Sequence, residues 1–515
     1  MIRTRAAWGW QRYLSATAFV TLVVSACAGS GTSDTNPQTA GAGPSVGGED
    51  PSASGHGGQT KAEGGRGAVT DSAGKGGAAA GSTSNDGAAG AMAGQAGDRS
   101  ELGGVGGSAG DAGSAGDTGS SGETGSAGDA GSSGAEIELG ANDAVAYRID
   151  RAHSGAQLSR RLEPPFVKLW SSTFNAAVSY PLIVGTRVFV TTLGQTGDPA
   201  VFAFDRDSGT RLWESAPIAS QFHEPAHLAY DAGLVITAND EGRVLALDAN
   251  TGDTVWAVKL DAIYGFGTMP VAADGTVYLT GATSDYKNLF ALDERDGSLR
   301  YRARGEGDGP ATLVGSRLFI SGGCHETFAD EPLNGQVLWH YKEGCSGGGG
   351  EITVFHEGQL FVADSGSSII ALDATSGALT RSIGGKDFGY WPMAVVGDRG
   401  FLPFQRARGG DLRAFDLTTG AEQWSFRLDE HPQLPTLVTP GYAFVLTRAD
   451  FADAFLQAVD LTQLKLVWTS AESVAKWTNY SPTGSQPVQG LAAGQGRIVV
   501  AFERTLTTFA SVAKQ

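Results

Sequence analysis

Basic residues and cysteine are both scarce in this chain. Lys and Arg number 37 against 55 Asp and Glu, which gives a formal net charge of −18 at pH 7. An acidic balance argues against nucleic acid or an anionic lipid surface as the main partner, because both attract basic proteins. The three cysteines are Cys27, Cys324 and Cys345, so the chain has no adjacent Cys pair and no Cys-x-x-Cys-His haem-attachment motif.

Long apolar runs are also missing, apart from one near the start. Residues 1–26 carry three Arg and no acid, and the apolar stretch 13–26 has the length of a signal-peptide core rather than of a membrane span. It ends in Val24-Ser25-Ala26-Cys27, which resembles a bacterial lipobox. We expect residues 1–26 to be a lipoprotein signal peptide and Cys27 to be lipidated; the alternative is an ordinary cleavage site beside an incidental Cys. Under the sorting rule of such lipoproteins, Ala28 implies the outer membrane.

Large apolar residues are nearly absent from the segment that follows. Residues 28–135 consist mainly of Gly, Ala, Ser and Asp, with twelve acidic and four basic side chains. Such a composition cannot bury enough apolar surface to offset the entropy of ordering, so we expect residues 27–140 to be a disordered linker. A Gly/Ser-rich coil of this length spans roughly 55–60 Å, enough to hold a folded domain away from a membrane.

The rest of the chain, residues 141–515, repeats one short phrase seven times. A clear copy runs from Ala246 to Trp256, and the pattern reads Ala-x-Asp-x-x-(Ser/Thr)-Gly-x-x-x-Trp. The Asp position recurs at intervals of 43, 45, 38, 42, 43 and 44 residues, a period typical of a four-stranded propeller blade. Each period holds four strand-like pieces, so the sequence predicts an all-β propeller. The Asp position is occupied by Asp205, Asp248, Asp293, Glu331, Asp373, Asp416 and Asp460.

The residues of the phrase have physical roles. The Asp carboxylate can accept hydrogen bonds from backbone N–H groups two or three residues on, and the Gly supplies the positive φ that ends the turn. The Ala keeps the third strand thin, and the Trp covers the next blade and buries on the order of 200 Å². Blades in which Tyr301, Glu331, Arg381 or Leu464 replaces the usual residue are expected to be less regular. The expected blade-docking residues are Trp170, Trp213, Trp256, Tyr301, Trp339, Trp424 and Trp468.

The two ends of the repeat region complete the blade count. Trp170 lies on a strand-like piece with no third strand before it, and the C-terminal pieces 498–502 and 506–509 have no Trp strand after them. Joined, they form an eighth blade. We therefore expect eight four-stranded blades in a ring that is closed by pairing of the N- and C-terminal strands.

The phrase resembles the tryptophan-docking repeat of the pyrroloquinoline-quinone (PQQ)-type propellers, a family that includes quinoprotein dehydrogenases and BamB-like outer-membrane assembly lipoproteins. The resemblance covers roughly residues 141–515, and the lead-in from Tyr147 to Gly155 resembles the segment that precedes the first Trp strand in such proteins. It implies the fold and not one activity, because the repeat is structural.

Catalytic chemistry has little support in the sequence. His223-Glu224-Pro225-Ala226-His227 matches the zinc-peptidase H-E-x-x-H pattern, but Pro225 disfavours a helix, and a strand would place the two His about 13 Å apart. The turns that start at Asp205 and Asp248 lack the Glu that completes a calcium loop. The resembled dehydrogenases use a vicinal Cys pair, which this chain lacks. We expect no catalytic residue, metal or cofactor; a PQQ-dependent dehydrogenase is the enzymatic alternative.

Binding residues are expected in the loops that join one blade to the next, where the repeats differ. Exposed aromatic side chains at the mouth of a propeller can anchor a peptide or a glycan; the alternative is that they pack over the core. The longest such loop runs from Ser470 to Pro487. The candidate binding residues are Phe222, Tyr264, Phe266, Tyr390, Trp391, Trp477 and Tyr480.

The expected export of the protein bears on its cysteines and on its role. In an exported protein the two remaining cysteines suggest one disulfide, Cys324–Cys345, with two buried free thiols as the alternative. We expect a monomeric, non-catalytic envelope lipoprotein that is held at the outer membrane by its lipid anchor and binds an envelope protein or glycan. One version is a scaffold in outer-membrane protein assembly, and the other is a tethered surface module that binds glycan or protein.

Overall fold

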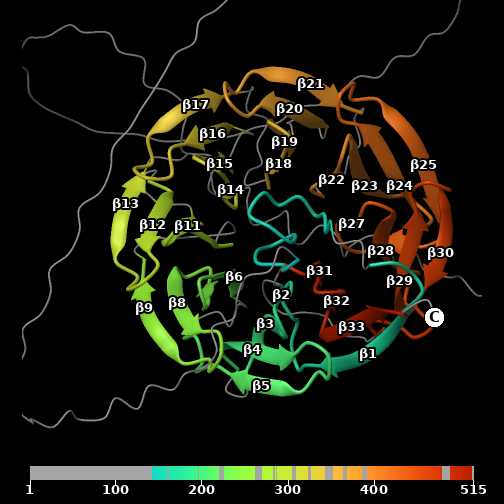
Figure 1. Ribbon diagram of the computed structural model, residues 1–515, viewed down its shortest axis with the longest axis horizontal. Coiled ribbons are helices and arrows are strands. Elements are labelled where there is room, and N and C mark those ends of the chain that lie inside the picture. Colours follow the sequence, from blue (N-terminus) through green and yellow to red (C-terminus); the bar gives the residue numbers. More distant parts are fainter. Residues whose placement is uncertain are drawn as a thin grey trace, which may run out of the picture. The chain divides into compact units, whose positions relative to one another are not determined.

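The computed structural model describes residues 142–158, 162–194, 197–219, 226–260, 269–281, 283, 285, 287–303, 309–322, 326–342, 352–363, 368–384, 391–477 and 488–512. These residues form eight antiparallel sheets arranged in a ring (Figure 1). The predicted eight-bladed propeller is therefore confirmed. Among the described residues, no helix has the length and apolar character needed to cross a membrane.

Each blade runs from an inner strand near the axis to an outer strand at the rim (Figure 1). The first blade contains β2 (Leu182–Val184), β3 (Arg187–Leu193), β4 (Pro199–Asp205) and β5 (Arg211–Glu214), and the second β6 (His227–Asp231), β7 (Leu234–Ala238), β8 (Arg243–Asp248) and β9 (Thr254–Lys259). The third contains β10 (Val271–Ala273), β11 (Thr276–Thr280), β12 (Leu289–Asp293) and β13 (Leu299–Ala303), and the fourth β14 (Thr312–Val314), β15 (Arg317–Ser321), β16 (Thr327–Asp330) and β17 (Val337–Tyr341).

The remaining blades follow the same order except at the end of the ring. The fifth contains β18 (Val354–His356), β19 (Gln359–Ala363), β20 (Ile369–Asp373) and β21 (Leu379–Ile383), and the sixth β22 (Ala394–Val396), β23 (Arg399–Gln405), β24 (Gly410–Asp416) and β25 (Glu422–Leu428). The seventh has five strands, β26 (His431–Pro432), β27 (Leu437–Val438), β28 (Tyr442–Arg448), β29 (Ala454–Asp460) and β30 (Lys465–Thr469). The eighth joins β1 (Phe166–Thr173) to β31 (Gly490–Gly494), β32 (Arg497–Phe502) and β33 (Thr505–Ser511).

The repeated phrase builds one local structure in the first seven blades. In the second blade, Asp248 Oδ1 accepts the backbone N–H groups of Asn250 and Thr251 at 2.8 and 2.9 Å, as the sequence predicts. Ala246 lies directly opposite Trp256 in the ladder, and the register shifts immediately after this pair. The same pairing and shift recur in the other six copies. A β-bulge at this point re-aims the side chains of the outer strand.

The tryptophan side chains reach from one blade to the turn of the next. Trp213 Nε1 donates to the Ala249 carbonyl oxygen at 3.2 Å. Gly252 approaches the indole so closely that a Cβ there would lie 2.6 Å from a ring carbon. The other indoles with this bond are Trp170 to Arg206 at 2.9 Å, Trp256 to Glu294 at 2.7 Å and Trp339 to Ala374 at 3.1 Å. Van der Waals contact and a hydrogen bond thus join these neighbouring blades.

Altered copies of the phrase keep this geometry in most cases. Tyr301 Oη donates to the Pro332 carbonyl oxygen at 2.5 Å, and the Arg381 guanidinium donates to the carbonyl oxygen of Leu417, the residue at the matching position. The third, fourth and fifth blades are ordinary four-stranded sheets. The expectation that they would be less regular is therefore wrong, because another donor can replace the indole. Leu464 lies in the seventh blade, which does have an extra strand.

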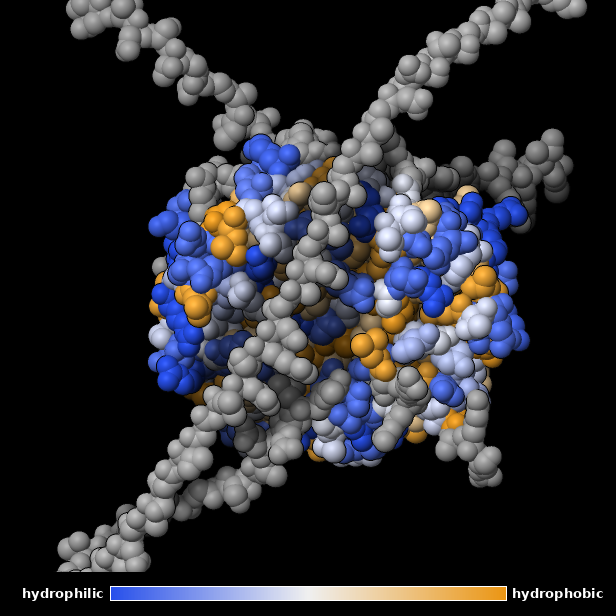
Figure 2. Space-filling model, turned by 45° about the horizontal axis from the view of Figure 1, so that its top comes forward, coloured by the Kyte–Doolittle hydropathy of each residue, from blue (hydrophilic) through white to orange (hydrophobic). Residues whose placement is uncertain are grey.

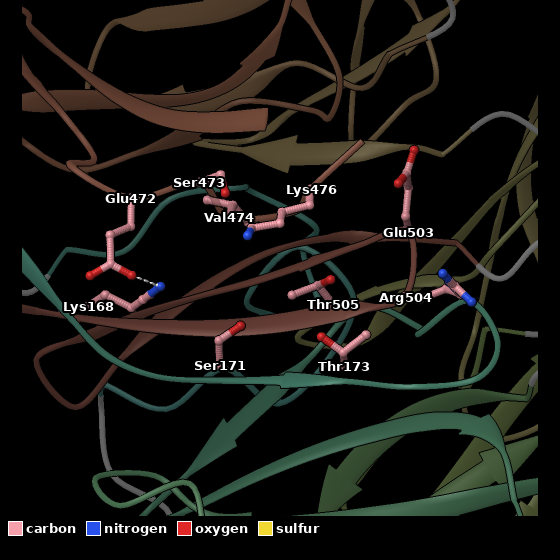
Figure 3. Close-up of a pocket in the computed structure, with 10 residues that line it drawn as sticks. All are labelled: Lys168, Ser171, Thr173, Glu472, Ser473, Val474, Lys476, Glu503, Arg504 and Thr505. Atoms are coloured by element: carbon pink, nitrogen blue, oxygen red, sulfur yellow. Dashed lines mark ion pairs between the residues drawn. The ribbon is translucent and has the colours of Figure 1, made fainter. Parts of the chain in front are cut away.

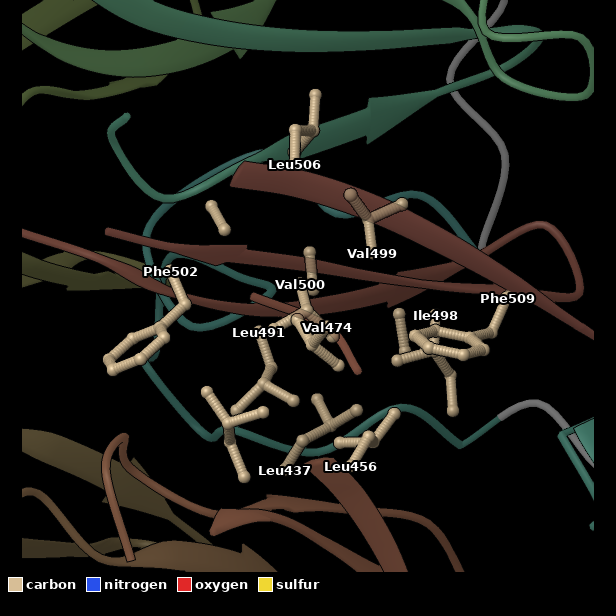
Figure 4. Close-up of a cluster of buried hydrophobic side chains, with 14 of the residues drawn as sticks. Leu437, Leu456, Val474, Leu491, Ile498, Val499, Val500, Phe502, Leu506 and Phe509 are labelled. Carbon is tan, nitrogen blue, oxygen red and sulfur yellow. The ribbon is translucent and has the colours of Figure 1, made fainter. Parts of the chain in front are cut away.

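The ring is closed by strands from opposite ends of the chain. β1 pairs with β33 along its length, as predicted, and the teal and red ribbons lie side by side (Figure 1). The largest buried apolar cluster lies at this closure and includes residues of the first, seventh and eighth blades. Figure 4 shows part of it, where Ile498 and Phe509 of the eighth blade pack near Leu456 of the seventh. Burial of this cluster therefore holds the two ends of the chain together.

Candidate functional site

Residues 142–158, which precede β1, lie at the centre of the ring (Figure 1). The segment hydrogen-bonds to an inner strand, or to the turn that follows it, in all eight blades. Its partners, in blade order, are Ile183, Tyr230, Ala272, Leu313, Phe355, Val395, Val438 and Gln495. The lead-in to β1 thus fills the axis at this level and contacts every blade. We call residues 142–158 the axial segment.

The buried charged side chains of the axial segment bind backbone carbonyl groups. Arg148 donates to the carbonyl oxygens of His153, Pro392 and Met393 at 3.1, 2.8 and 2.7 Å. Burial lowers the pKa of Arg148 to about 10. The two ring nitrogens of His153 lie 2.9 and 3.0 Å from the carbonyl oxygens of Tyr147 and Ala311, and burial lowers the pKa of His153. These groups fasten the segment to the blades.

A buried pair of carboxyl groups lies beside the axial segment. Arg151 Nη2 is 2.6 Å from Asp231 Oδ1. Burial raises the pKa of Asp231, and burial together with the nearby Asp231 charge raises the pKa of Glu294 to about 7. Two such carboxyl groups can share one proton. Within the described ranges, no group of three or more His, Cys, Asp or Glu side chains is placed to hold a metal ion.

The structure describes only some of the residues expected to form sites. Trp391 is half-buried and precedes Pro392, which binds Arg148 at the axis. His227 lies on strand β6, as expected, buried with its ring stacked 6.2 Å from that of Tyr180. Residues 223–225 of the H-E-x-x-H pattern lie outside the described part. So do Cys27, Cys324, Cys345, Phe222, Tyr264, Phe266, Tyr390 and Tyr480.

A polar pocket of about 520 Å³ lies where the seventh blade meets the ring closure (Figure 3). Strand β1, the start of the long loop after β30, and the β32–β33 turn contribute its walls. It is lined by Lys168, Ser171, Thr173, Glu472, Ser473, Val474, Lys476, Glu503, Arg504 and Thr505. We call it the seam pocket. Lys168 forms an ion pair with Glu472 across it, and Arg448 Nη1 lies 2.5 Å from Glu503 Oε1.

Hydrogen bonds fix the loop that covers the seam pocket. Val474 N donates to the Ala454 carbonyl oxygen at 2.8 Å, and the Val474 carbonyl accepts from Thr507 Oγ1 at 3.1 Å. The first bond ties the loop to β29 of the seventh blade, and the second ties it to β33 of the eighth. Ala454 and Ala475 also form an antiparallel bridge. The wall formed by residues 472–476 is therefore held by both blades.

Two aromatic side chains stand exposed beside the seam pocket. Phe451, in the β28–β29 loop, is 78% exposed, and Trp477 is 38% exposed. Their ring centroids are 5.8 Å apart and the rings are nearly perpendicular, at 86°. The Trp477 backbone N–H donates to Asp453 Oδ1 at 2.8 Å. We call Phe451 and Trp477 the aromatic corner, and the corner with the seam pocket the seam site.

Sequence reasoning found only part of the seam site. The loop after Ser470 stands out in the sequence by its length, and Trp477 by its aromatic side chain. Lys168 and Glu503 carry no local motif, and they meet only because the ring closes. Phe451 had one sequence signal, since a large aromatic residue in a polar turn is unusual. Its backbone φ of 57° is a left-handed conformation that bulky residues rarely adopt.

Comparison with known proteins identifies the family. A family model described as outer membrane protein assembly factor BamB matches residues 197–330 and 328–511, more than half of the chain. The chain belongs to this family. BamB of Moranella endobia is 28% identical over 272 residues, which span 47% of this chain and 66% of that protein. BamB of Nitrosomonas eutropha is 29% identical over 216 residues, which span 38% of this chain and half of that protein.

Solved structures share the fold of this BamB-family chain. BamB from Moraxella catarrhalis superposes with a TM-score of 0.52 at 13% identity, over 68% of this chain and 99% of that one. A europium-containing methanol dehydrogenase superposes with a TM-score of 0.56 at 14% identity, over 73% of this chain and 99% of that one. At such identities the likeness concerns the fold alone, which is common to binding proteins and enzymes.

Proposed function

We propose that this protein is a non-catalytic binding scaffold of the cell envelope that takes part in outer-membrane protein assembly. Its BamB-family membership supports the process, and the aromatic corner supports a binding role. A Phe that is 78% exposed contributes little to folding, and its left-handed backbone costs stability. Aromatic residues, including Phe and Trp, are enriched in protein–protein interfaces. The exposed Phe451–Trp477 pair is the observation that carries the proposal.

The proposed location rests on the chain before the axial segment. We infer that residues 1–26 are a signal peptide, that Cys27 carries the lipid anchor at the outer membrane, and that residues 27–140 are the tether of the 141–515 propeller. Detergent partitioning and mass spectrometry of the mature protein test this directly. A Cys27→Ser variant should move to the soluble periplasmic fraction; lipid-free wild-type protein would contradict the anchor.

Photo-crosslinking in cells tests the binding role. A photoreactive amino acid at Phe451 of the full chain should capture an envelope protein, and a component of the outer-membrane assembly machinery or a nascent barrel protein is expected. The same amino acid at Leu333, which is 81% exposed in the fourth blade, is the matched control. The proposal fails if Phe451 captures nothing, or if both positions capture the same set of proteins.

A tethered module that binds glycan or protein at the cell surface is the second candidate. The hydroxyl groups of Ser171, Thr173, Ser473 and Thr505 in the seam pocket favour it, because sugars bind through such groups. Protease treatment of whole cells separates the two roles. Cleavage in intact cells favours surface display, and protection favours the periplasmic scaffold. A dehydrogenase role has only the shared fold in its favour.

A further inference from the structure

The seam pocket carries more cations than acids, and one of its cations is Lys476. Three cations, Lys168, Lys476 and Arg504, line it together with two acids. Both acids are already paired, Glu472 with Lys168 and Glu503 with Arg448. Within the part of the chain that the structure describes, Lys476 has no ion-pair partner, and its ammonium group points into the pocket (Figure 3). The pocket is therefore cationic on a protein whose net charge is −18.

The Glu472 carboxylate, which pairs with Lys168, can be replaced by a carboxylate from another molecule. The Glu472 side chain is 66% exposed, whereas that of Lys168 is 25% exposed. Exposed ion pairs contribute little to stability, so the glutamate can swing into water at small cost. Lys168 and Lys476 would then face the pocket together, with the surrounding hydroxyl groups as further donors. A carboxylate from another molecule could take the place of the Glu472 side chain.

The aromatic corner adds an apolar contact next to the cationic pocket. Lys476 and Trp477 are consecutive residues, so the two parts are joined by one peptide unit. Because the two rings are nearly perpendicular, one apolar side chain of a partner can contact both of them. In an extended peptide, residues two to four positions apart are separated by roughly 7–13 Å. Such a peptide can contact the corner and the pocket at the same time.

We propose that the seam site binds an extended polypeptide segment, with an acidic side chain in the seam pocket and an apolar side chain against the aromatic corner. The inference rests on the proposed function and deepens it by naming the chemistry of the protein partner. Figure 2 shows that hydrophobic and hydrophilic side chains lie intermingled on the visible face, so an isolated apolar contact gives little selectivity. The pairing of charge with an apolar contact supplies it.

Binding of defined peptides to the purified full chain tests the proposal. The probe is a fluorescent Gly/Ser peptide with one Leu and a pair of Asp, made with several spacings between them, and binding is read by anisotropy. Binding should weaken with salt and disappear when Asn replaces both Asp. Lys476→Met and Trp477→Ala should each weaken it about fivefold, equivalent to about 1 kcal/mol. Lys465→Met, at an exposed lysine on β30, should leave it unchanged.

A gain of affinity is the sharpest expected result. Glu472→Gln removes the internal competitor and should tighten peptide binding about threefold, which misfolding would not do. Melting curves like that of the wild type confirm that each variant is folded. The proposal is overturned if the Asn peptide binds equally well, if Glu472→Gln weakens binding, or if inorganic phosphate or a uronic-acid oligosaccharide binds where the peptide does not.

Crosslinking keeps this inference separate from the proposed function. If a chain with Lys476→Met and Trp477→Ala combined captures its envelope partner at Phe451 as well as the wild type does, Lys476 and Trp477 are not part of the contact and the inference alone fails. If the wild-type chain captures no envelope protein at all while the peptide binds as expected, the proposed function fails and the peptide site stands.

Discussion

Asp330 gives the sharpest test of how this propeller is stabilised. It occupies the position before the Asp of the phrase, where the other six copies have Phe204, Leu247, Leu292, Leu372, Phe415 and Val459. Asp330 is 0% exposed, and neither carboxylate oxygen has a hydrogen-bond partner among the described residues. A carboxyl group is thus buried in a position that the fold otherwise fills with an apolar side chain.

Burial of the Asp330 carboxyl group determines how much this residue lowers the free energy of unfolding and how that loss depends on pH. It raises the pKa of Asp330 from 3.8 to about 7. The unfolded chain therefore releases the proton near pH 4, whereas the folded chain keeps it until about pH 7. Stability is highest below the unfolded pKa, falls as pH rises between these values and is level above them. At about 1.4 kcal/mol per pKa unit, the full loss is about 4 kcal/mol.

Two substitutions separate the charge from the shape. Asp330→Leu keeps the branched shape and removes the carboxyl group, so it should raise the free energy of unfolding at every pH, by about 2 kcal/mol in acid from apolar burial alone. The gain should grow to about 6 kcal/mol at pH 8, where the wild type also bears the cost of the charge. Asp330→Asn keeps the polarity without the titration, so it should match the wild type in acid and exceed it at pH 8.

Denaturant unfolding followed by tryptophan fluorescence, repeated from pH 4.5 to pH 9, measures these differences. Other titrating groups, including Glu294, are common to all three proteins, so their effects cancel in the comparison. The reasoning is refuted if Asp330→Leu is no more stable than the wild type at pH 8. It is also refuted if Asp330→Asn shows the pH slope of the wild type, since the slope would then come from another group.

Three further substitutions test the contacts between blades and at the axis. Gly252→Ala should lower the free energy of unfolding by at least about 2 kcal/mol more than Gly233→Ala does. Both glycines have positive φ, but only a Cβ at Gly252 would strike the Trp213 ring. Equal losses would contradict the docking of Trp213 on this turn. Leu464→Gly should raise the unfolding midpoint, with a gain of about 1 kcal/mol, since Leu464 has a φ of 51°. Arg148→Met should cost about 3–5 kcal/mol, because carbonyl groups lose their buried donor; an unchanged melting temperature would mean that the axial segment does not brace the ring.

The fold was predictable because its information is local and repeated. The spacing of the Asp positions gave the blade period, and the unmatched pieces at the two ends gave the closing pair β1 and β33. The role of Arg381 was not predictable, since the replacement of Trp at that position suggests that the contact with the next blade is lost. The structure has it donating to the Leu417 carbonyl instead. An Arg side chain can thus make the hydrogen bond to the next turn that an indole makes in other blades.

The site and the axial segment were harder to predict for the same reason. Residues 142–158 have no periodicity, because each contact is made with a different blade and mainly through backbone groups. The seam pocket joins residues from three separate parts of the sequence, and none has a motif. Asp330 is the opposite case. An alignment of the seven phrases shows an acid at a position that is otherwise apolar. Only the structure shows the consequence, which is a buried carboxyl group without a hydrogen-bond partner among the described residues.

The position of the seam site follows from the way in which the ring closes. The phrase needs its third and fourth strands to be joined by one turn, and in the eighth blade these strands come from opposite ends of the chain. Trp468 therefore has no Gly turn to pack on and packs instead against Phe166 and Phe509, with centroids 5.3 and 5.8 Å away. The contact between the seventh and eighth blades thus lacks the Trp-on-turn packing of the repeat. Exposed aromatic residues and an available lysine are tolerated there, so a partner can bind without breaking a blade contact.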